Sequence, residues 1–250
     1  MDALVDTRQG KKDALDPEIP LLDMIDRVGE RYQAWVHKPH FHSKSLYLFA
    51  KSGFLEFNSH MSWYLIPAFW TPFFIYHMYK AYSYNNLSIW FYPFAILLSQ
   101  FSWGILEYSL HRWAFHAKTN HWITNRLHFI FHGVHHLTPM DTERLVFPPI
   151  PGYILIYTPA RLFFGLFLTN MTFFHLFLGF GIVAYICYDL THYYIHHGRK
   201  VGGIFKYLKE THNHHHFAAN GEESNFGVSL NGKVIDYILR TNVDPTESKQ

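Results

Sequence analysis

The chain has 250 residues, of which 19% are aromatic and 16% are charged, and its formal net charge at pH 7 is +2. Twenty residues are histidines, and because neutral imidazoles do not neutralise phosphates, this composition excludes a basic nucleic-acid-binding surface. One cysteine, Cys187, excludes an internal disulfide framework and a cysteine-rich zinc ribbon. The low charge and the long apolar blocks favour an integral membrane protein.

The N-terminal part of the chain predicts a polar lead followed by an amphipathic helix. Residues 1–19 have no apolar core typical of a secretory signal, and we expect them to be flexible. From Pro20 to about Pro39, apolar residues recur at helical spacing with charged residues between them. This helix either lies on a membrane surface or packs against the rest of the protein, and the pattern fits both interpretations.

Four apolar blocks follow, each near the length that crosses the hydrocarbon core of a bilayer: residues 63–79, 89–106, 150–168 and 171–190. Short connections join the first block to the second and the third to the fourth, which predicts two helical hairpins. Each hairpin returns the chain to its starting side, where 19 of the 21 lysines and arginines lie. The positive-inside rule assigns that side to the cytosol.

The predicted fold class is therefore an all-α, multi-pass integral membrane protein with four transmembrane helices in two hairpins and a cytosolic helical cap. We expect one membrane domain at residues 20–243 and a tail at residues 244–250.

The histidines cluster in the segments that this topology places in the cytosol. Residues three or four apart on a helix share a face, which is a metal-ligand spacing. The clusters are His111 and His116; His132, His135 and His136; His192 and His196; and His212, His215 and His216. Because one ion takes at most about six ligands, these ten imidazoles predict a dimetal site with about five ligands per ion. Imidazole suits iron, zinc, copper and nickel, so the donor type leaves the metal open.

One of these clusters does not fit an ideal helix. His111 and His116 are five residues apart, which corresponds to a turn of about 140° around the helix axis. The two residues either straddle a helix end, contain a bulge between them, or serve two different metals.

The remaining polar residues have supporting roles in this interpretation. We expect His128, Glu107 and Asp189 to orient the ligands rather than to bind metal. The isolated histidines are expected to be core or capping residues, and these are His37, His40, His42, His60, His77, His121 and His175. His197 and His214 should point away from the site. Asp141, Glu143 and Arg144 are expected to pair with one another.

Four segments carry the clusters: EYSLHRWAFH (residues 107–116), LHFIFHGVHHLTPMDTERLVFPP (127–149), YDLTHYYIHHG (188–198) and LKETHNHHHFA (208–218). They closely resemble the fatty acid 2-hydroxylases of the integral-membrane fatty acid hydroxylase superfamily, and the likeness runs from about residue 20 to residue 241. The resemblance implies an endoplasmic reticulum enzyme that hydroxylates C2 of long or very long fatty acyl chains of sphingolipids. It implies that the ten clustered histidines are the ligands and that Tyr185, Tyr188 and Asp189 orient the carbonyl end of the substrate.

The cofactors and partners follow from the same resemblance and from the chemistry. Breaking an unactivated C–H bond needs a redox-active metal, which zinc is not, so we expect two iron ions that activate O2, although a purified sample can carry zinc. The sequence has no flavin or nucleotide motif, so a partner supplies the electrons. Many relatives carry an N-terminal cytochrome b5 domain where this chain has about nineteen polar residues, so a separate cytochrome b5 with its NADH reductase is expected. Residues 218–227 are longer and more acidic than the usual turn of the family, which bears on substrate entry.

Two other functions compete with this interpretation. A histidine-rich metal transporter should carry ionisable residues along its spans, and here these are only His77, Arg161, His175 and Asp189, without an aligned path. Another lipid oxidation on the same scaffold, such as sterol methyl oxidation or C4 sphingoid hydroxylation, is disfavoured by HGVHHLTPMD and RLVFPP, but only product analysis decides. The sequence leaves open whether free acid, acyl-CoA or ceramide is the substrate.

Overall fold

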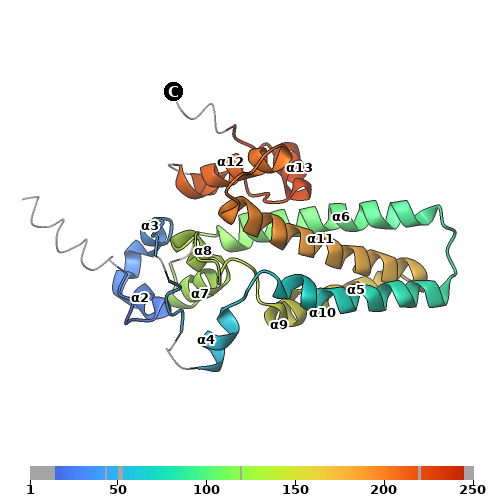
Figure 1. Ribbon diagram of the computed structural model, residues 1–250, viewed down its shortest axis with the longest axis horizontal. Coiled ribbons are helices and arrows are strands. Elements are labelled where there is room, and N and C mark those ends of the chain that lie inside the picture. The colour runs from blue at the N-terminus through green and yellow to red at the C-terminus, as the bar shows by residue number, and fades with distance from the viewer. Residues whose placement is uncertain (1–14, 43, 50–52, 119, 219–220, 245–250) are drawn as a thin grey trace, which may run out of the picture.

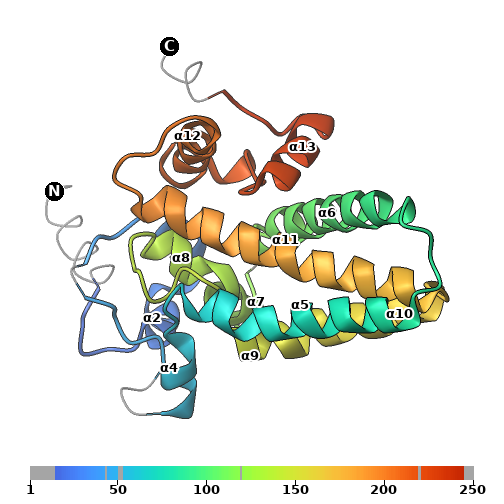
Figure 2. The same ribbon diagram turned by 45° about the vertical axis from the view of Figure 1, so that its right-hand side comes forward.

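The computed structural model describes residues 15–42, 44–49, 53–118, 120–218 and 221–244. Most of the predicted lead and nearly all of the predicted tail lie outside these ranges. Within them the chain is helical, and no residue is assigned to a strand. Four long helical segments form a rod, and shorter helices gather mainly around one end of it (Figure 1). Figure 2 shows the same arrangement from another side, with the long helices running side by side. We call the shorter helices the cap.

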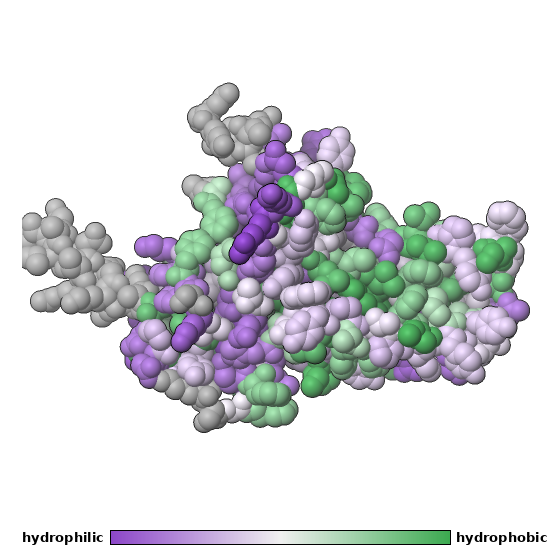
Figure 3. Space-filling view, in the orientation of Figure 1, coloured by the Kyte–Doolittle hydropathy of each residue, from purple (hydrophilic) through white to green (hydrophobic). Residues whose placement is uncertain are grey.

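The long helices form at the four apolar blocks of the sequence. They are α5 (Leu65–Tyr84), α6 (Phe91–Ser109), the continuous segment α9 (Pro149–Gly152), η4 (Tyr153–Tyr157) and α10 (Thr158–Phe167), and α11 (Met171–His197). In the described part of the chain, Pro149–Phe167 and Met171–His197 are long and apolar enough to cross a membrane. Figure 3 shows that hydrophobic residues dominate the rod, whereas hydrophilic residues gather on the cap.

The two hairpin turns meet at the end of the rod that lies away from the cap. Asn85 closes α5 in the left-handed conformation, and the next residue, Asn86, accepts a hydrogen bond from the hydroxyl of Thr172 at 2.6 Å. Asn170 caps the start of α11 by accepting a hydrogen bond from the N–H of Phe173 at 3.0 Å. The hairpins therefore lie in parallel, as the sequence predicts.

Helix α11 extends beyond its predicted end. Its 27 residues correspond to a length of about 40 Å, whereas the hydrocarbon core of a bilayer is about 30 Å thick. The extra turns carry His192 and His196 into the cap. The apolar block ends at Leu190, but the helix continues because no proline or glycine interrupts it before Gly198.

The cap is built from two groups of helices. The first consists of α2 (Leu21–Val28), η1 (Gly29–Arg31), α3 (Tyr32–Val36), α4 (Phe54–Ser59), α7 (Trp122–His128), η3 (Phe129–Gly133) and α8 (Val134–Leu137). The second consists of α12 (Ile204–Phe217), η5 (Gly221–Glu223) and α13 (Leu230–Ile238). The segment η2 (Leu110–Phe115) joins α6 to the cap.

The predicted amphipathic helix is α2 followed by α3, and its apolar face is buried. Met24 and Ile25 are 2% and 3% exposed, and they pack in one cluster with Trp35, Phe129 and Leu137. Of the two interpretations that the sequence allows, packing against the protein is therefore the one that the structure supports.

Candidate metal centre

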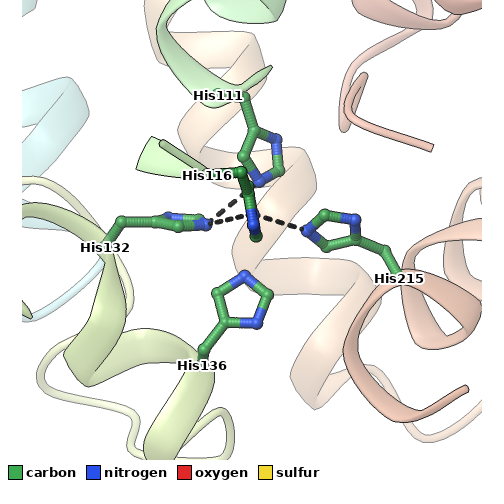
Figure 4. A group of neighbouring side chains, drawn as sticks. All are labelled: His111, His116, His132, His136 and His215. Carbon is green, nitrogen blue, oxygen red and sulfur yellow. Dashed lines mark hydrogen bonds between the residues drawn. The ribbon is translucent and has the colours of Figure 1, made fainter. Parts of the chain in front are cut away.

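The ten clustered histidines come together in the cap as two groups of five. We call the first group site 1, formed by His111, His116, His132, His136 and His215, and the second site 2, formed by His135, His192, His196, His212 and His216. Within each group, one ring nitrogen of every residue lies within 4.8 Å of those of the others. Nine of the ten residues are buried, and His116 is partly buried. Figure 4 shows the rings of site 1 converging on one point from different sides.

Each H-x2-HH triplet is divided between the two sites. In α8 and the turn before it, His132 and His136 are four residues apart and join site 1, whereas His135 joins site 2. Neighbouring residues on a helix point about 100° apart, so the adjacent histidines diverge. In α12 the division is reversed, since His215 joins site 1 and its two companions join site 2.

The irregular pair His111 and His116 is explained by a π-helical turn. The N–H of His116 donates to the carbonyl of His111 at 3.0 Å, which is the i to i+5 hydrogen bond of a π-helix. The wider turn brings residues five apart to the same face, and His116 is also the first residue after the turn. The pair thus combines the bulge and the helix end, and both residues belong to site 1.

Main-chain carbonyls orient two ligands of site 1. The Nδ1 atom of His111 donates to the carbonyl of Phe226, and that of His215 donates to the carbonyl of Ser224 at 2.7 Å. Because a carbonyl can only accept, each Nδ1 must carry the proton of its neutral ring. Both Nε2 atoms therefore present a lone pair to the centre of the site.

The loop that supplies these carbonyls is itself held by two buried carboxylates. Glu107, which is 4% exposed, accepts hydrogen bonds from the N–H groups of Val228 at 2.7 Å and Ser229 at 2.8 Å. The sequence places Glu107 as a direct partner of a ligand one turn away, but in the structure it acts through the loop at residues 224–229.

The second carboxylate is Asp236 of α13, which is fully buried. It accepts hydrogen bonds from the N–H groups of Phe226 at 3.0 Å and Gly227 at 2.8 Å, and from the ammonium group of Lys233 at 3.2 Å. Sequence reasoning missed Asp236 because it lies 20 residues beyond the last histidine cluster and because the main-chain N–H groups that it binds have no sequence signature.

The spacing of the ring nitrogens fits bound metal ions. In site 1 the Nε2 atom of His132 lies 3.1 Å from the Nε2 atoms of both His111 and His116. In site 2 the Nε2 atom of His212 has three such neighbours at 2.9 to 3.1 Å. A single ring proton cannot satisfy three partners, so lone pairs face one another unless a cation lies between them. At a metal–nitrogen distance of about 2.1 Å, ligands at right angles are separated by about 3.0 Å.

The electrostatics of the cap also suit metal binding. Burial lowers the pKa of His132, His136 and His215 well below the ordinary histidine value, and charge on neighbouring imidazoles lowers it further. These rings are therefore neutral near pH 7, the form in which histidine binds a metal. The two groups fit metal sites.

The predicted orienting residues Tyr185, Tyr188 and Asp189 lie on α11 below the sites. Asp189 accepts a hydrogen bond from the N–H of Phe147 at 3.4 Å, and the hydroxyl of Tyr185 donates to the carbonyl of the same residue at 3.2 Å. The ring of Tyr188 lies 6.0 Å from that of His192. The RLVFPP string thus folds against α11 through the main chain of Phe147.

Arg144 of the same string was expected to pair with its sequence neighbours Asp141 and Glu143, but its closest carboxylate is that of Glu56. It is 7% exposed and lies 2.5 Å from a carboxylate oxygen of Glu56, whereas its closest approach to Asp141 is 3.8 Å. Glu143 instead contacts the ring of His60 at 2.8 Å. The expectation that the three charged residues pair with one another is confirmed for Arg144 and Asp141 but not for Glu143, and α4 brings a closer carboxylate, Glu56, to the guanidinium.

The other histidines lie outside both groups. The Nδ1 atom of His128 lies 2.5 Å from the hydroxyl of Tyr32, and His121 caps α7. His77 and His175 are in contact inside the rod at 2.8 Å. His37 was expected to be an ordinary core residue, but its ring stacks on that of His116 at 5.7 Å, so it packs against site 1. His197 and His214 belong to neither group.

An apolar cavity of about 520 Å³ lies in the rod. Its walls come from α6, from the segment η4 to α10, and from α11, and they include Trp103, Leu110, Phe164, Gly181 and Tyr185. Leu110 directly precedes His111, and Tyr185 is bonded to the Phe147 main chain, so one end of the cavity lies next to the metal sites. The other end extends along the rod toward Phe164.

A rod of apolar helices, a polar cap and two five-histidine groups beside an apolar cavity define a helical, membrane-type protein with two candidate metal sites. The family model for fatty acid hydroxylase matches residues 96–241. The chain belongs to this family.

Several relatives agree with this assignment. The human fatty acid 2-hydroxylase is 34% identical over 250 residues, covering 92% of this chain and 65% of the human protein. The dihydroceramide fatty acyl 2-hydroxylase FAH2 of Arabidopsis thaliana is 35% identical over 221 residues, covering 88% of this chain and 92% of that protein. A solved structure of full-length scs7p, with only its hydroxylase domain visible, is 32% identical with a TM-score of 0.81, covering 96% of this chain and 89% of that one. The chain thus spans about two thirds of the length of its mammalian relatives.

Proposed function

We propose that the protein is a dimetal monooxygenase that hydroxylates C2 of long or very long fatty acyl chains of sphingolipids or ceramides. The observation that carries the proposal is the position of two five-histidine sites at the head of an apolar cavity. The relatives named fatty acid 2-hydroxylase and dihydroceramide fatty acyl 2-hydroxylase support the reaction and the substrate class.

In this proposal the ten histidines of sites 1 and 2 hold two iron ions. When bound, iron supplies the O2 activation and the oxidising power that replacement of a C–H bond by C–OH requires, which zinc does not. The protein keeps the ligand rings neutral by burial. It also fixes the tautomers of His111 and His215 through the Phe226 and Ser224 carbonyls.

The cavity positions the substrate. Its volume is within the range of small-molecule sites, and its apolar walls favour an alkyl chain by about 0.8 kcal/mol for each buried CH2 group. With the tail along α10 and α11, the carbonyl end lies near Tyr185, Tyr188 and Asp189. Because C2 is next to the carbonyl carbon, holding that end in place selects C2 for reaction.

We further propose that the domain at residues 20–243 crosses the endoplasmic reticulum membrane four times and that its active site faces the cytosol. The meeting of both hairpin turns at one end of the rod supports this topology, as does the sequence, in which 19 of the 21 lysines and arginines fall outside the two predicted hairpins. A separate cytochrome b5 with its NADH reductase would deliver electrons to the cytosolic face.

The test is to feed an isotope-labelled fatty acid to cells that express the chain and to locate any new hydroxyl group by lipid mass spectrometry. We expect 2-hydroxy sphingolipids from the unchanged chain and from His197→Ala, whose ring lies outside both sites, and no such product from His132→Ala. Normal product from a stably expressed His132→Ala chain would refute the metal assignment. A hydroxyl group at C4 of the sphingoid base would refute the reaction.

A further inference from the structure

Helix α13 buries two charged residues, and of its apolar residues only Ile235 is buried with them. Lys233 is 7% exposed and Asp236 is fully buried, although both are charged residues. The outward residues are spaced at i, i+4, i+7 and i+8, which is one face of a helix. They are Leu230 (52% exposed), Val234 (52%), Tyr237 (78%) and Ile238 (58%). We call these four residues the α13 face.

The orientation of α13 is fixed by its buried contacts. Lys233 and Asp236 are 3.2 Å apart, and Lys233 also donates to the side chain of Asn225 at 3.2 Å. Rotating the helix to bury its apolar face would expose this ion pair, break the contact of Lys233 with Asn225 and release the N–H groups of Phe226 and Gly227. In water, this arrangement would cost free energy twice, because it desolvates charges and hydrates apolar side chains.

The position of α13 indicates which medium covers the face. The side chain of Asn231 donates to that of Gln100 on α6 at 3.1 Å, and a Cβ on Gly104 would lie 2.8 Å from the Asn231 carbonyl oxygen. Gln100 lies nine residues before Ser109, the last residue of α6, which corresponds to about 13 Å along the helix. Helix α13 therefore flanks α6 within the apolar block (Figure 1).

Helix α6 also has exposed apolar residues close to α13. Phe101 and Ile105 of α6 directly follow Gln100 and Gly104 in the sequence, and they are 48% and 44% exposed. Figure 3 shows hydrophobic residues at the position of α13, beside the hydrophobic surface of the rod. An apolar face on a helix that packs against a predicted membrane span, beside exposed apolar residues of that span, fits one occupant, which is the lipid of the same leaflet.

We propose that α13 lies in the plane of the bilayer interface, on the side of the cap, with Leu230, Val234, Tyr237 and Ile238 among the acyl chains. This inference rests on the proposed transmembrane topology and adds an interfacial helix to it. Asp236 of the same helix binds the loop whose carbonyls orient His111 and His215. The lipid-facing helix therefore stabilises the position of these two site 1 residues.

The single cysteine of the chain makes a direct test possible. Cys187 is exposed on α11, so a label on it reports on the rod. In a Cys187→Ser background, Val234→Cys places a single label on the α13 face. In the same background, Glu210→Cys places a single label on the exposed side of α12. Each variant is labelled with an environment-sensitive fluorophore and reconstituted in phosphatidylcholine vesicles. Quenching is measured with lipids brominated near the headgroup end of the acyl chains and with aqueous iodide.

We expect brominated lipid to quench the labels at 187 and 234 and iodide to quench the label at 210. If iodide quenches the label at 234 as strongly as the label at 210 while lipid still quenches at 187, the placement of α13 is wrong and the topology stands. A label at 234 that neither agent reaches would mean that protein covers the face, which also overturns the inference. Failure of lipid to quench at 187 would instead count against the transmembrane topology.

Discussion

Glu107→Gln should weaken one metal site and spare the other. The substitution keeps the shape of the side chain but removes the charge that strengthens its hydrogen bonds from the N–H groups of Val228 and Ser229. Hydrogen bonds to charged groups contribute about 1.5 to 3 kcal/mol, against about 0.5 to 1.5 for neutral ones, so at a pH at which Glu107 is ionised the two bonds together lose about 2 kcal/mol. This free energy holds the loop whose carbonyls orient His111 and His215.

Both of those histidines belong to site 1, so the effect should be selective. A loss of about 2 kcal/mol corresponds to roughly 30-fold in an equilibrium constant, which is within the 10-fold to 100-fold range for outer partners of metal ligands. The assay is a chelator titration of the metal-loaded protein, with metal per chain counted by mass spectrometry. We expect the variant to give up its first metal ion at roughly 30-fold lower chelator activity than the unchanged chain.

The exposed residue Glu210 provides the matched control, since Glu210→Gln makes the same chemical change on the surface of α12. Release of both ions at the same chelator activity as in the unchanged chain would refute the role of the loop. Equal weakening of both sites without a change in melting temperature would also refute it, because the structure connects Glu107 to site 1 alone through these contacts.

Three further changes test the cavity and the contacts of α4. Gly181 lines the cavity, and a Cβ there meets no atom within 4 Å. Gly181→Leu should therefore fill part of the cavity and shift the products toward shorter acyl chains, whereas Gly165→Ala, outside the cavity, should not. Lipid mass spectrometry measures the products of both variants. Arg144→Met leaves the carboxylate of Glu56 buried without its partner at 2.5 Å and should cost about 3 to 5 kcal/mol, seen as a lower melting temperature. Burial raises the pKa of Glu56, but hydrogen bonds and the Arg144 charge outweigh it and hold the pKa below 4.5. This stabilisation is complete above pH 4.5 and is lost as the pH falls through the lower folded pKa, so Glu56→Gln should weaken the acid dependence of unfolding followed by circular dichroism.

The helices of the rod could be predicted because their sequence signal is strong and local. Long apolar blocks with connections of a few residues leave little choice except hairpins, and the structure places helices at all four blocks. The end of α11 was placed too early because the prediction followed hydropathy, whereas the helix continues through polar residues until Gly198. Packing of α2 against α7 could not be separated from membrane binding, since both bury the same apolar face.

The sequence predicts which ten histidines come together, but not how they divide between the two groups. Their spacing predicts metal ligands, and their number predicts two ions. Each H-x2-HH triplet divides between the two sites according to how its helix is oriented relative to the other helices that carry ligands. No local sequence pattern encodes that orientation. The π-helical turn at His111 and the carbonyls of Ser224 and Phe226 are also invisible in the sequence, because they are main-chain features that follow from packing.

The divided triplets have a mechanical consequence for the centre. On α8, His135 and His136 are consecutive residues of one rigid turn, yet they join different sites, and on α12 His215 and His216 do the same. The rings of His136 and His216 are 4.3 Å apart and stacked across the boundary between the sites. The relative position of the two sites is therefore set by helix geometry, which is stiffer than a loop. Carbonyls of the loop at residues 224–229, which Glu107 and Asp236 hold, accept hydrogen bonds from two ligands of site 1. We infer that site 1 is the more adjustable of the two, so disturbance of the cap should reach it first.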